Sequence, residues 1–325
     1  MQRNHIIWIV APILIVIVSI AGTLYYAVGN SRRKLIISTT TSLYDTGLFD
    51  TIEDHFEEKY PVDLYVISVG TGLAISHAER GDVDLILVHA PQKELAFLER
   101  GFGTSRKIIA YNFFAIVGPE SDPAGIMDLT PNQALLKIVE YGRAQGVKWV
   151  SRGDDSGTHT KEKGMWTDAG LNWTSMREED WYIEAGTGMG KTLQVADNLD
   201  AYTLADMGTF LKYKKDEIIS LRTLVTQGEE LLNVYSVIAG NMTRHPHLNY
   251  DDAITFIKFL ISDEGQEIIY NFAKQDYGQS LFYPAVNLLR QNTDPELVQW
   301  IMNYSFFEGH ECPPEYWGNH PELYP

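Results

Sequence analysis

Short apolar runs alternate with amphipathic stretches along most of the chain. Four runs, at residues 35–38, 64–70, 83–90 and 113–118, predict buried strands, and polar turns with helical stretches follow the first two. The run at 83–90, VDLILVHA, is almost continuously apolar, as expected for a strand that is covered on both faces. The first third of the chain therefore predicts one α/β unit.

A second group of elements follows. Residues 147–151 and 181–186 predict two further strands, and 233–241 predicts a strand that returns to the first unit. Residues 251–273 predict an amphipathic helix with a break at a glycine. Repeated strand, turn and helix predict doubly wound α/β sheets, in which ligand groups gather at the carboxyl ends of the strands.

The N-terminal stretch has a different pattern. Residues 6–28 are uncharged and apolar on every face, and as a helix they span about 30 Å of hydrocarbon. Because no good cleavage site follows, we expect an uncleaved signal anchor in residues 1–33. Arg32, Arg33 and Lys34 outweigh Arg3, so the positive-inside rule predicts a cytoplasmic domain. The function inferred below predicts the opposite, and we expect the domain outside.

Charge narrows the choice of partners. The chain has 325 residues and a net charge of −17, and all 43 acidic residues lie after Lys34. Nucleic acids are excluded, because their binding needs clustered Lys and Arg. An anion site in this chain must work through short-range dipoles, since the long-range field repels anions. The single cysteine, Cys312, allows no intramolecular disulfide.

Four turns that follow predicted strands share one character. They combine hydroxyl residues with glycines just before a helix and lie at residues 39–42, 69–72, 151–159 and 186–192. A helix N-terminus offers free N–H groups and roughly half a positive charge, and glycine lets an anion approach the backbone. Such turns are also ordinary helix caps when taken singly. Four of them at one sheet edge predict a site for a small dianion.

Several uncommon strings occur in order along residues 35–285: TTTSLYDTGLFD, VGTG, GDVDLILVHAPQKE, RKIIAYNFFAIVGPESDPA, SRGDDSGTH, GTGMGKTL and AYTLADMGTFL. Together they resemble the tungstate-binding proteins of Tup-type ABC transporters. The resemblance implies a type II periplasmic-binding fold, with two doubly wound α/β lobes joined by a two-strand hinge. We expect lobe 1 at residues 34–117 and 236–325, and lobe 2 at residues 118–235.

The resemblance also implies a function and partners. Such a protein captures tungstate, or molybdate, outside the cell membrane and delivers it to a permease with an ATPase subunit. It needs no cofactor and is not an enzyme. Phosphate or sulfate binding and a membrane-anchored anion sensor stay open as alternatives, and a neighbouring permease gene would favour transport.

The loop at residues 152–158 also resembles the R-x-D-x-S-G-T loop of phosphate-binding proteins. The resemblance implies that Arg152 contacts the anion, that Asp154 braces Arg152, and that Ser156, Gly157 and Thr158 donate hydrogen bonds. By the same carry-over, the donors of the first lobe are Thr41 or Ser42 and Thr71. Secondary candidates are Thr40, Gly72, Lys191 and Thr192.

His89 is the informative departure from the phosphate binders. They carry an aspartate at this position, which accepts the proton of monohydrogen phosphate, whereas an imidazole can donate. A site made of donors suits an oxyanion without a proton, such as tungstate, molybdate or sulfate. A histidine with a purely structural hydrogen bond is the alternative.

Two other kinds of site fit the sequence poorly. A phosphate-binding P-loop would need glycine where Ala185 stands, and Ser156 beside His159 at a helix start is poor geometry for a nucleophile and its base. His310, Cys312 and His320 lack the regular spacing of a metal site. We therefore expect a binding protein without a metal.

Overall fold

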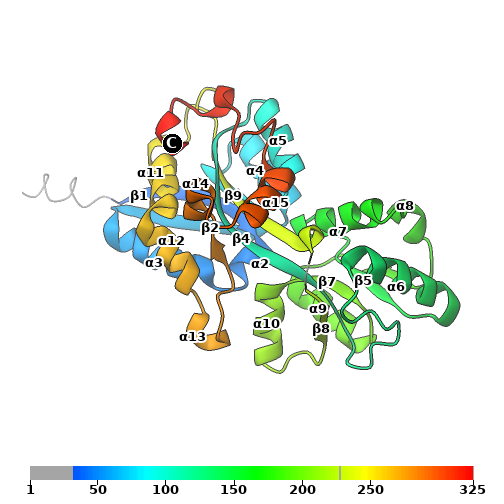
Figure 1. The fold of residues 1–325 in the computed structure, drawn as a ribbon. Coiled ribbons are helices and arrows are strands. Elements are labelled where there is room, and N and C mark those ends of the chain that lie inside the picture. The colour runs from blue at the N-terminus through cyan, green and yellow to red at the C-terminus, as the bar shows by residue number, and fades with distance from the viewer. Residues whose placement is uncertain (1–31, 227, 325) are drawn as a thin grey trace, which may run out of the picture.

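The computed structural model describes residues 32–226 and 228–324 (Figure 1). Nearly all of the predicted signal anchor at residues 1–33 lies outside these ranges. Within them, no helix is both long and apolar enough to cross a lipid bilayer.

Strands and helices alternate through much of the chain. The strands are β1 (Arg33–Thr40), β2 (Val62–Val69), β3 (Leu85–Val88), β4 (Gly103–Gly118), β5 (Trp149–Ser151), β6 (Tyr182–Glu184), β7 (Thr203–Asp206), β8 (Arg222–Val225), β9 (Leu232–Gly240) and β10 (Tyr283–Pro284). The helices are α2 (Thr41–Tyr44), α3 (Leu48–Lys59), α4 (Thr71–Arg80), α5 (Pro91–Glu99), α6 (Pro131–Gln145), α7 (Gly157–Asp168), α8 (Trp173–Met176), α9 (Met189–Asn198), α10 (Met207–Lys215), α11 (Tyr250–Ile261), α12 (Asp263–Asn271), α13 (Lys274–Tyr277), α14 (Val286–Gln291) and α15 (Pro295–Ser305). Three short 3₁₀ helices are η1 (Glu229–Leu231), η2 (Pro314–Tyr316) and η3 (Pro321–Leu323).

β4 is the strand that holds the architecture together. The main sheet has the order β10-β4-β9-β3-β1-β2, with β1, β2 and β3 parallel and β9 antiparallel to β3 and β4. β4 pairs with β9 as far as Phe113 and with β7 from Phe114 onward. One strand therefore passes from one half of the molecule into the other.

Apolar side chains form separate cores in these two halves, which we call lobe 1 and lobe 2 (Figure 1). In lobe 1, α3 and α11 cover one face of the sheet, while α4 and α5 cover the other. Leu85 and Leu87 face the first layer, whereas Ile86 and Val88 face the second. In lobe 2, α6 and α7 pack on one side, while α9 and α10 pack on the other. The predicted α/β architecture, with sheets covered on both faces, is confirmed.

Some elements differ from the sequence-based expectation. β4 begins at Gly103 and not near residue 113, and β7 and β8 were not anticipated. The helix at 251–273 breaks at Ser262, whose hydroxyl caps the N–H of Gly265. Gly265 serves close packing, because a Cβ there would lie 2.2 Å from the carbonyl oxygen of Phe259.

The C-terminal segment, residues 305–324, covers β4 where β10 does not reach. The Glu311 carboxylate accepts the N–H of Ile108 at 2.5 Å, and the Tyr324 hydroxyl donates to the carbonyl of Arg106 at 2.7 Å. The guanidinium of Arg106 is fully buried; it pairs with Glu94 at 2.8 Å and donates to Ser305 Oγ at 2.7 Å. The bonds from Glu311 and Tyr324 satisfy backbone groups at a strand edge that would otherwise be open.

We expect Arg106→Met to lower the free energy of unfolding by about 3–5 kcal/mol, because Glu94 is left buried without its partner. Urea denaturation measures the change. Arg143→Met is the matched control: its pair with Glu179 is exposed, so the loss should stay below about 1 kcal/mol. Equal losses in the two variants would contradict a structural role for the buried pair.

Candidate functional site

A cleft of about 520 Å³ lies where the two lobes meet. Lobe 1 contributes the starts of α2 and α4, and lobe 2 contributes the loops that lead into α7 and α9. The cleft is lined by Thr41, Gly70, Gly72, Leu73, Ser76, Arg152, Asp154, Asp155, Gly186, Thr187 and Gly188. Each of the four hydroxyl- and glycine-rich turns, or the helix that follows it, therefore contributes residues to this cleft.

Arg152 supplies the positive charge of this cleft. It follows β5 directly, and its side chain is almost fully buried. Nη2 donates to Asp154 Oδ2 at 2.5 Å and to Thr41 Oγ1 at 3.3 Å, while Asp154 Oδ1 accepts the N–H of Ser156 at 3.2 Å. Asp154 therefore holds the guanidinium and, at the same time, the turn into α7.

Three buried donors at this junction have no partner within the part of the chain that the structure describes. They are the hydroxyls of Thr71 and Thr158 and the Nε of Arg152. Thr71 begins α4 in lobe 1, and Thr158 lies in the first turn of α7 in lobe 2. Buried polar groups nearly always have partners, so this donor set fits an anion that accepts hydrogen bonds from both lobes.

Ser156 and Gly157 have local roles in the same loop. The Ser156 hydroxyl caps α7 by accepting the N–H of His159 at 3.2 Å. A Cβ on Gly157 would lie 2.4 Å from Cε1 of His89, so the imidazole occupies the space that the missing side chain leaves. The sequence suggested that glycine admits the anion here; in the structure it admits a histidine from the other lobe.

His89 follows β3 and is almost completely buried. Its Nδ1 lies 2.8 Å from Asn233 Oδ1, and the Asn233 amide nitrogen donates to Asn112 Oδ1 and Tyr235 Oη. The amide oxygen therefore faces the ring, which makes Nδ1 the protonated nitrogen. Burial lowers the pKa of His89 to about 4, so the ring is neutral at pH 7.

This geometry differs from the donor role expected of His89. A neutral imidazole that is protonated at Nδ1 has an acceptor at Nε2, not a second donor. The ring also stacks on Tyr235, with centroids 4.9 Å apart. His89 therefore contributes to the packing of Gly157 and the start of α7, and the donor N–H that we expected is directed at Asn233.

The secondary candidates divide into two groups. Thr40 ends β1 in a buried position, and Gly72 lines the cleft, where a Cβ would lie 2.6 Å from Asp155 Oδ2. Lys191 is exposed, and the Thr192 hydroxyl donates to the carbonyl of Gly188 at 3.1 Å, so neither is among the lining residues. The backbone of Ser42 begins α2 together with Thr41.

An ion pair across the cleft was not anticipated. Lys93 Nζ of α5 in lobe 1 lies 2.7 Å from Asp155 Oδ1 in lobe 2. The left-handed backbone of Asp155, with φ of 56°, turns this carboxylate toward the partner lobe. The Asp-Asp pair in SRGDDSG was the one available signal, but sequence spacing could not link it to a lysine on a distant helix.

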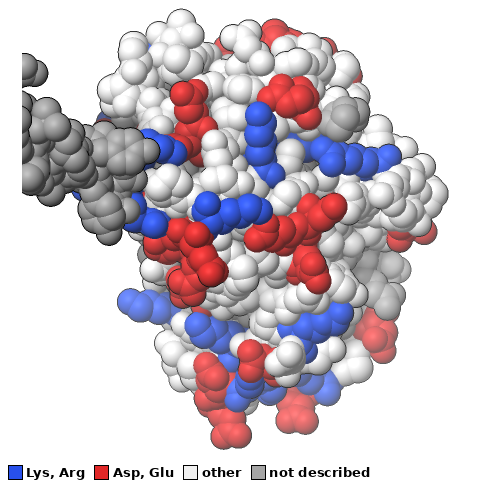
Figure 2. Space-filling view, turned by 90° about the vertical axis from the view of Figure 1, so that its left-hand side faces the viewer, with Lys and Arg blue, Asp and Glu red and all other residues white. Residues whose placement is uncertain are grey.

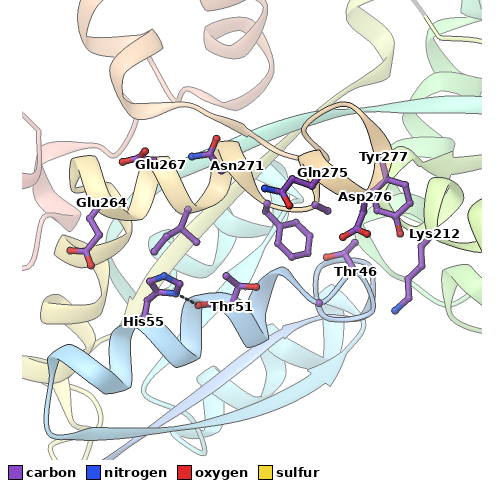
Figure 3. Close-up of a pocket in the computed structure, with 14 residues that line it drawn as sticks. Thr46, Thr51, His55, Lys212, Glu264, Glu267, Asn271, Gln275, Asp276 and Tyr277 are labelled. Carbon is purple, nitrogen blue, oxygen red and sulfur yellow. Dashed lines mark hydrogen bonds between the residues drawn. The ribbon is translucent and has the colours of Figure 1, made fainter.

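A second cavity, of about 730 Å³, lies between α3 and α12–α13 (Figure 3). Glu264 and Glu267 project from α12 on the side opposite His55 and Thr51 of α3, and Asp276 lies near Tyr277. Its one lysine, Lys212, donates to the carbonyl of Asp45 at 2.8 Å. Three carboxylates and a lysine already engaged make this cavity unsuitable for an anion.

The face shown in Figure 2, the metal-ligating side chains of the described residues and the cysteine give no sign of a competing site. On the face in Figure 2, acidic and basic side chains lie interspersed, and neither sign forms a continuous patch. Among residues 32–226 and 228–324, no group of three His, Cys, Asp or Glu side chains could hold a metal ion. Cys312 is buried, and burial raises the pKa of its thiol.

Comparisons with known proteins agree with this geometry. The sequence profile of the PBP superfamily domain matches residues 27–264. A protein of Haloferax volcanii named for anion binding by an ABC transporter is 42% identical over 279 residues, which are 84% of this chain and 78% of that protein. The tungstate-binding protein TupA of Peptoclostridium acidaminophilum is 38% identical over 257 residues, covering 78% of this chain and 86% of that protein.

Solved structures agree as well. The tungstate-binding protein TupA from Desulfovibrio alaskensis is 39% identical, covers 78% of this chain and 98% of its own, and superposes with a TM-score of 0.66. A tungstate ABC transporter structure from Geobacter sulfurreducens is 42% identical, covers 73% of this chain and 97% of its own, and has a TM-score of 0.65. The resemblance inferred from the motifs is confirmed: the chain belongs to the PBP superfamily and, within it, to the family of the tungstate-binding TupA proteins.

Proposed function

We propose that this protein is the extracytoplasmic substrate-binding protein of an ABC transporter, which captures tungstate or molybdate between its lobes and releases it unchanged for import. One observation carries the proposal: three buried donors have no partner among the described residues, namely Arg152 Nε in the cleft lining, the hydroxyl of Thr71 between the lining residues Gly70 and Gly72, and the hydroxyl of Thr158 at the start of α7. Relatives named for tungstate and anion binding support it.

The anion-binding residues that we propose are Thr41, Ser42, Thr71, Arg152, Ser156, Gly157 and Thr158, with Thr40 and Gly72 beside them. Asp154 acts as the brace of Arg152. His89 we place behind Gly157, where it shapes the loop without donating to the anion. Among the described residues that line the cleft, Arg152 is the one cation, so the dipoles of the helix starts must supply the remaining positive potential.

The lobe division that we propose is residues 34–117 with 236–325 for lobe 1, and residues 118–235 for lobe 2. β4 and the segment that leads into β9 connect the lobes, so a small rotation at these two connections opens and closes the cleft. Closure brings the first turn of α4 against the loop before α7 and removes water from the anion.

The proposed function implies three partners: a permease, an ATPase subunit and the membrane, which the protein reaches through the signal anchor at residues 1–33.

Two of the positive charges that favoured a cytoplasmic domain have a structural role. Arg32 is bonded to Asp63 and to the carbonyl of Val62, and Arg33 forms a two-pronged pair with Asp252 at 2.7 and 2.8 Å. Because these arginines attach β1 to the rest of the domain, their presence does not require a role in setting the orientation of the protein in the membrane.

We expect Arg152→Met to weaken tungstate binding by about 2–5 kcal/mol, because the variant loses a buried charge-assisted donor and leaves Asp154 unpaired. Titration calorimetry with sodium tungstate measures the change, and Arg177→Met, at an exposed pair, serves as the control. Asp154→Asn should also weaken binding, since Arg152 loses its brace. If Asp154→Asn tightened binding without changing stability, the aspartate would be a repulsive charge and not a brace.

We expect tungstate and molybdate to bind more tightly than phosphate at neutral pH. Both carboxylates that line the cleft are engaged, Asp154 by Arg152 and Asp155 by Lys93, so the proton of monohydrogen phosphate finds no free carboxylate. An unpaired buried polar group costs about 1–3 kcal/mol. Competition titrations test this expectation, and phosphate affinity equal to that for tungstate would contradict it.

His89→Asp should lower tungstate affinity more than His89→Asn, because only the former adds a negative charge beside Gly157.

We expect the domain to face outward. Protease added to intact cells should release a folded fragment that is cut before Arg32, because Arg32 and Arg33 are bonded within the folded domain. Immunoblotting follows the fragment, and a cytoplasmic enzyme must stay intact in the same sample. If the domain is protected in intact cells and is digested only after lysis, it faces the cytoplasm, and a role in import is contradicted.

A further inference from the structure

Lys161 is a buried cation that the proposed anion site does not use. It lies on α7, one helical turn after Gly157, and its side chain belongs to a residue that is only 9% exposed. Its ammonium nitrogen stands 4.0 Å from the centroid of the Tyr304 ring on α15. Because α7 belongs to lobe 2 and α15 packs on lobe 1, this cation–π contact joins the lobes.

α15 is fixed firmly to lobe 1 at the end that carries Tyr304. The next residue, Ser305, is held by the buried guanidinium of Arg106, which is itself paired with Glu94. The preceding residue, Asn303, donates to Glu229 Oε1 at 3.2 Å, in the lobe-2 segment that leads into β9, and so makes a second contact between α15 and lobe 2. Tyr304 is therefore a rigid lobe-1 surface against which the start of α7 rests.

The surroundings of Lys161 show why its buried charge depends on the Tyr304 ring. Asp168 on α7 and Glu229 and Glu230 at η1 act on it as neighbouring charges, and Glu94 acts on Tyr304 from α5. A cavity of about 750 Å³ lies between the lobes, and its lining includes Lys161, Tyr304 and the carboxylates of Asp168, Glu229 and Glu230. Burial lowers the pKa of Lys161 to about 8, so the ammonium form still predominates at pH 7 and its burial must be compensated. The Tyr304 ring face is the group in contact that does so.

We infer that Tyr304 and Lys161 are positioning residues for anion capture, which hold the anion-binding end of α7 against lobe 1 when the cleft is closed. Any separation of the lobes takes the ammonium away from the ring, so the contact favours the closed arrangement and thereby raises anion affinity. The inference rests on the proposed function, because the affected property is affinity for the oxyanion. It gives α15, which lies beyond residues 27–264 of the superfamily match, a part in ligand binding.

The test is calorimetric titration of the full chain with sodium tungstate at pH 7. Tyr304→Leu keeps an apolar side chain but removes the π face, and we expect it to weaken binding by about 5- to 30-fold, as befits a partly desolvated cation–π contact. Tyr304→Phe keeps the ring and should stay near the wild-type affinity. In a Lys161→Met background, Tyr304→Leu should change nothing further, because the pair is already broken.

A measurement without ligand separates this inference from the proposed function. Spin labels on Tyr65→Cys in lobe 1 and Leu199→Cys in lobe 2, both exposed positions, report the distance between the lobes. Tyr304→Leu should broaden that distance distribution, and Tyr304→Phe should not. If the wild-type protein does not bind tungstate, but Tyr304→Leu still broadens the distance distribution, only the proposed function is overturned. Unchanged distances, or an equal affinity loss in the Lys161→Met background, would overturn the positioning role.

Discussion

The pairing of β4 with two sets of partners is the constraint on which the rest of the structure depends. Its first part pairs with β9 in the lobe-1 sheet, and its last residues are the strand to which β7 and β8 add in lobe 2. Since the strand is continuous, it fixes the place at which the two sheets meet. The turns that follow β1 and β2 therefore meet the turns that follow β5 and β6 at one cleft.

Electrostatics sets the character of that space. A chain with a net charge of −17 holds an anion only where its own carboxylates are neutralised at short range. Asp154 is engaged by Arg152, and Asp155 by Lys93, so each acidic residue of the lining has a cation beside it. Hydroxyls and backbone N–H groups then act on the anion at close range without a large positive field. This arrangement suits a fully ionised oxyanion better than one that carries a proton.

Local features of the site were predictable from sequence, and contacts between the lobes were not. The R-x-D-x-S-G-T string fixes a turn, a cap and an arginine brace within a few residues, so Arg152, Asp154 and Ser156 could be assigned before the structure. The pairing of His89 with Asn233, and its contact with Gly157, join segments far apart in the chain. No spacing rule reports such contacts, so the sequence could not show that the Nδ1 side of His89 faces Asn233. β7 and β8 were missed because each is a short strand that is defined by its pairing with β4.

The C-terminal cover of β4 also bears on the order in which lobe 1 is completed. Lobe 1 is assembled from discontinuous pieces, and the edge of β4 stays incomplete until Glu311 and Tyr324 have been synthesised and have docked. A nascent chain that ends anywhere between β4 and this cover exposes an unsatisfied strand and the buried arginine Arg106 without its full set of partners. Completion of lobe 1 therefore depends on a segment that is distant in the chain from the strand it covers. A chain that lacks this segment therefore cannot complete the lobe-1 sheet around β4, although every residue that lines the cleft precedes it.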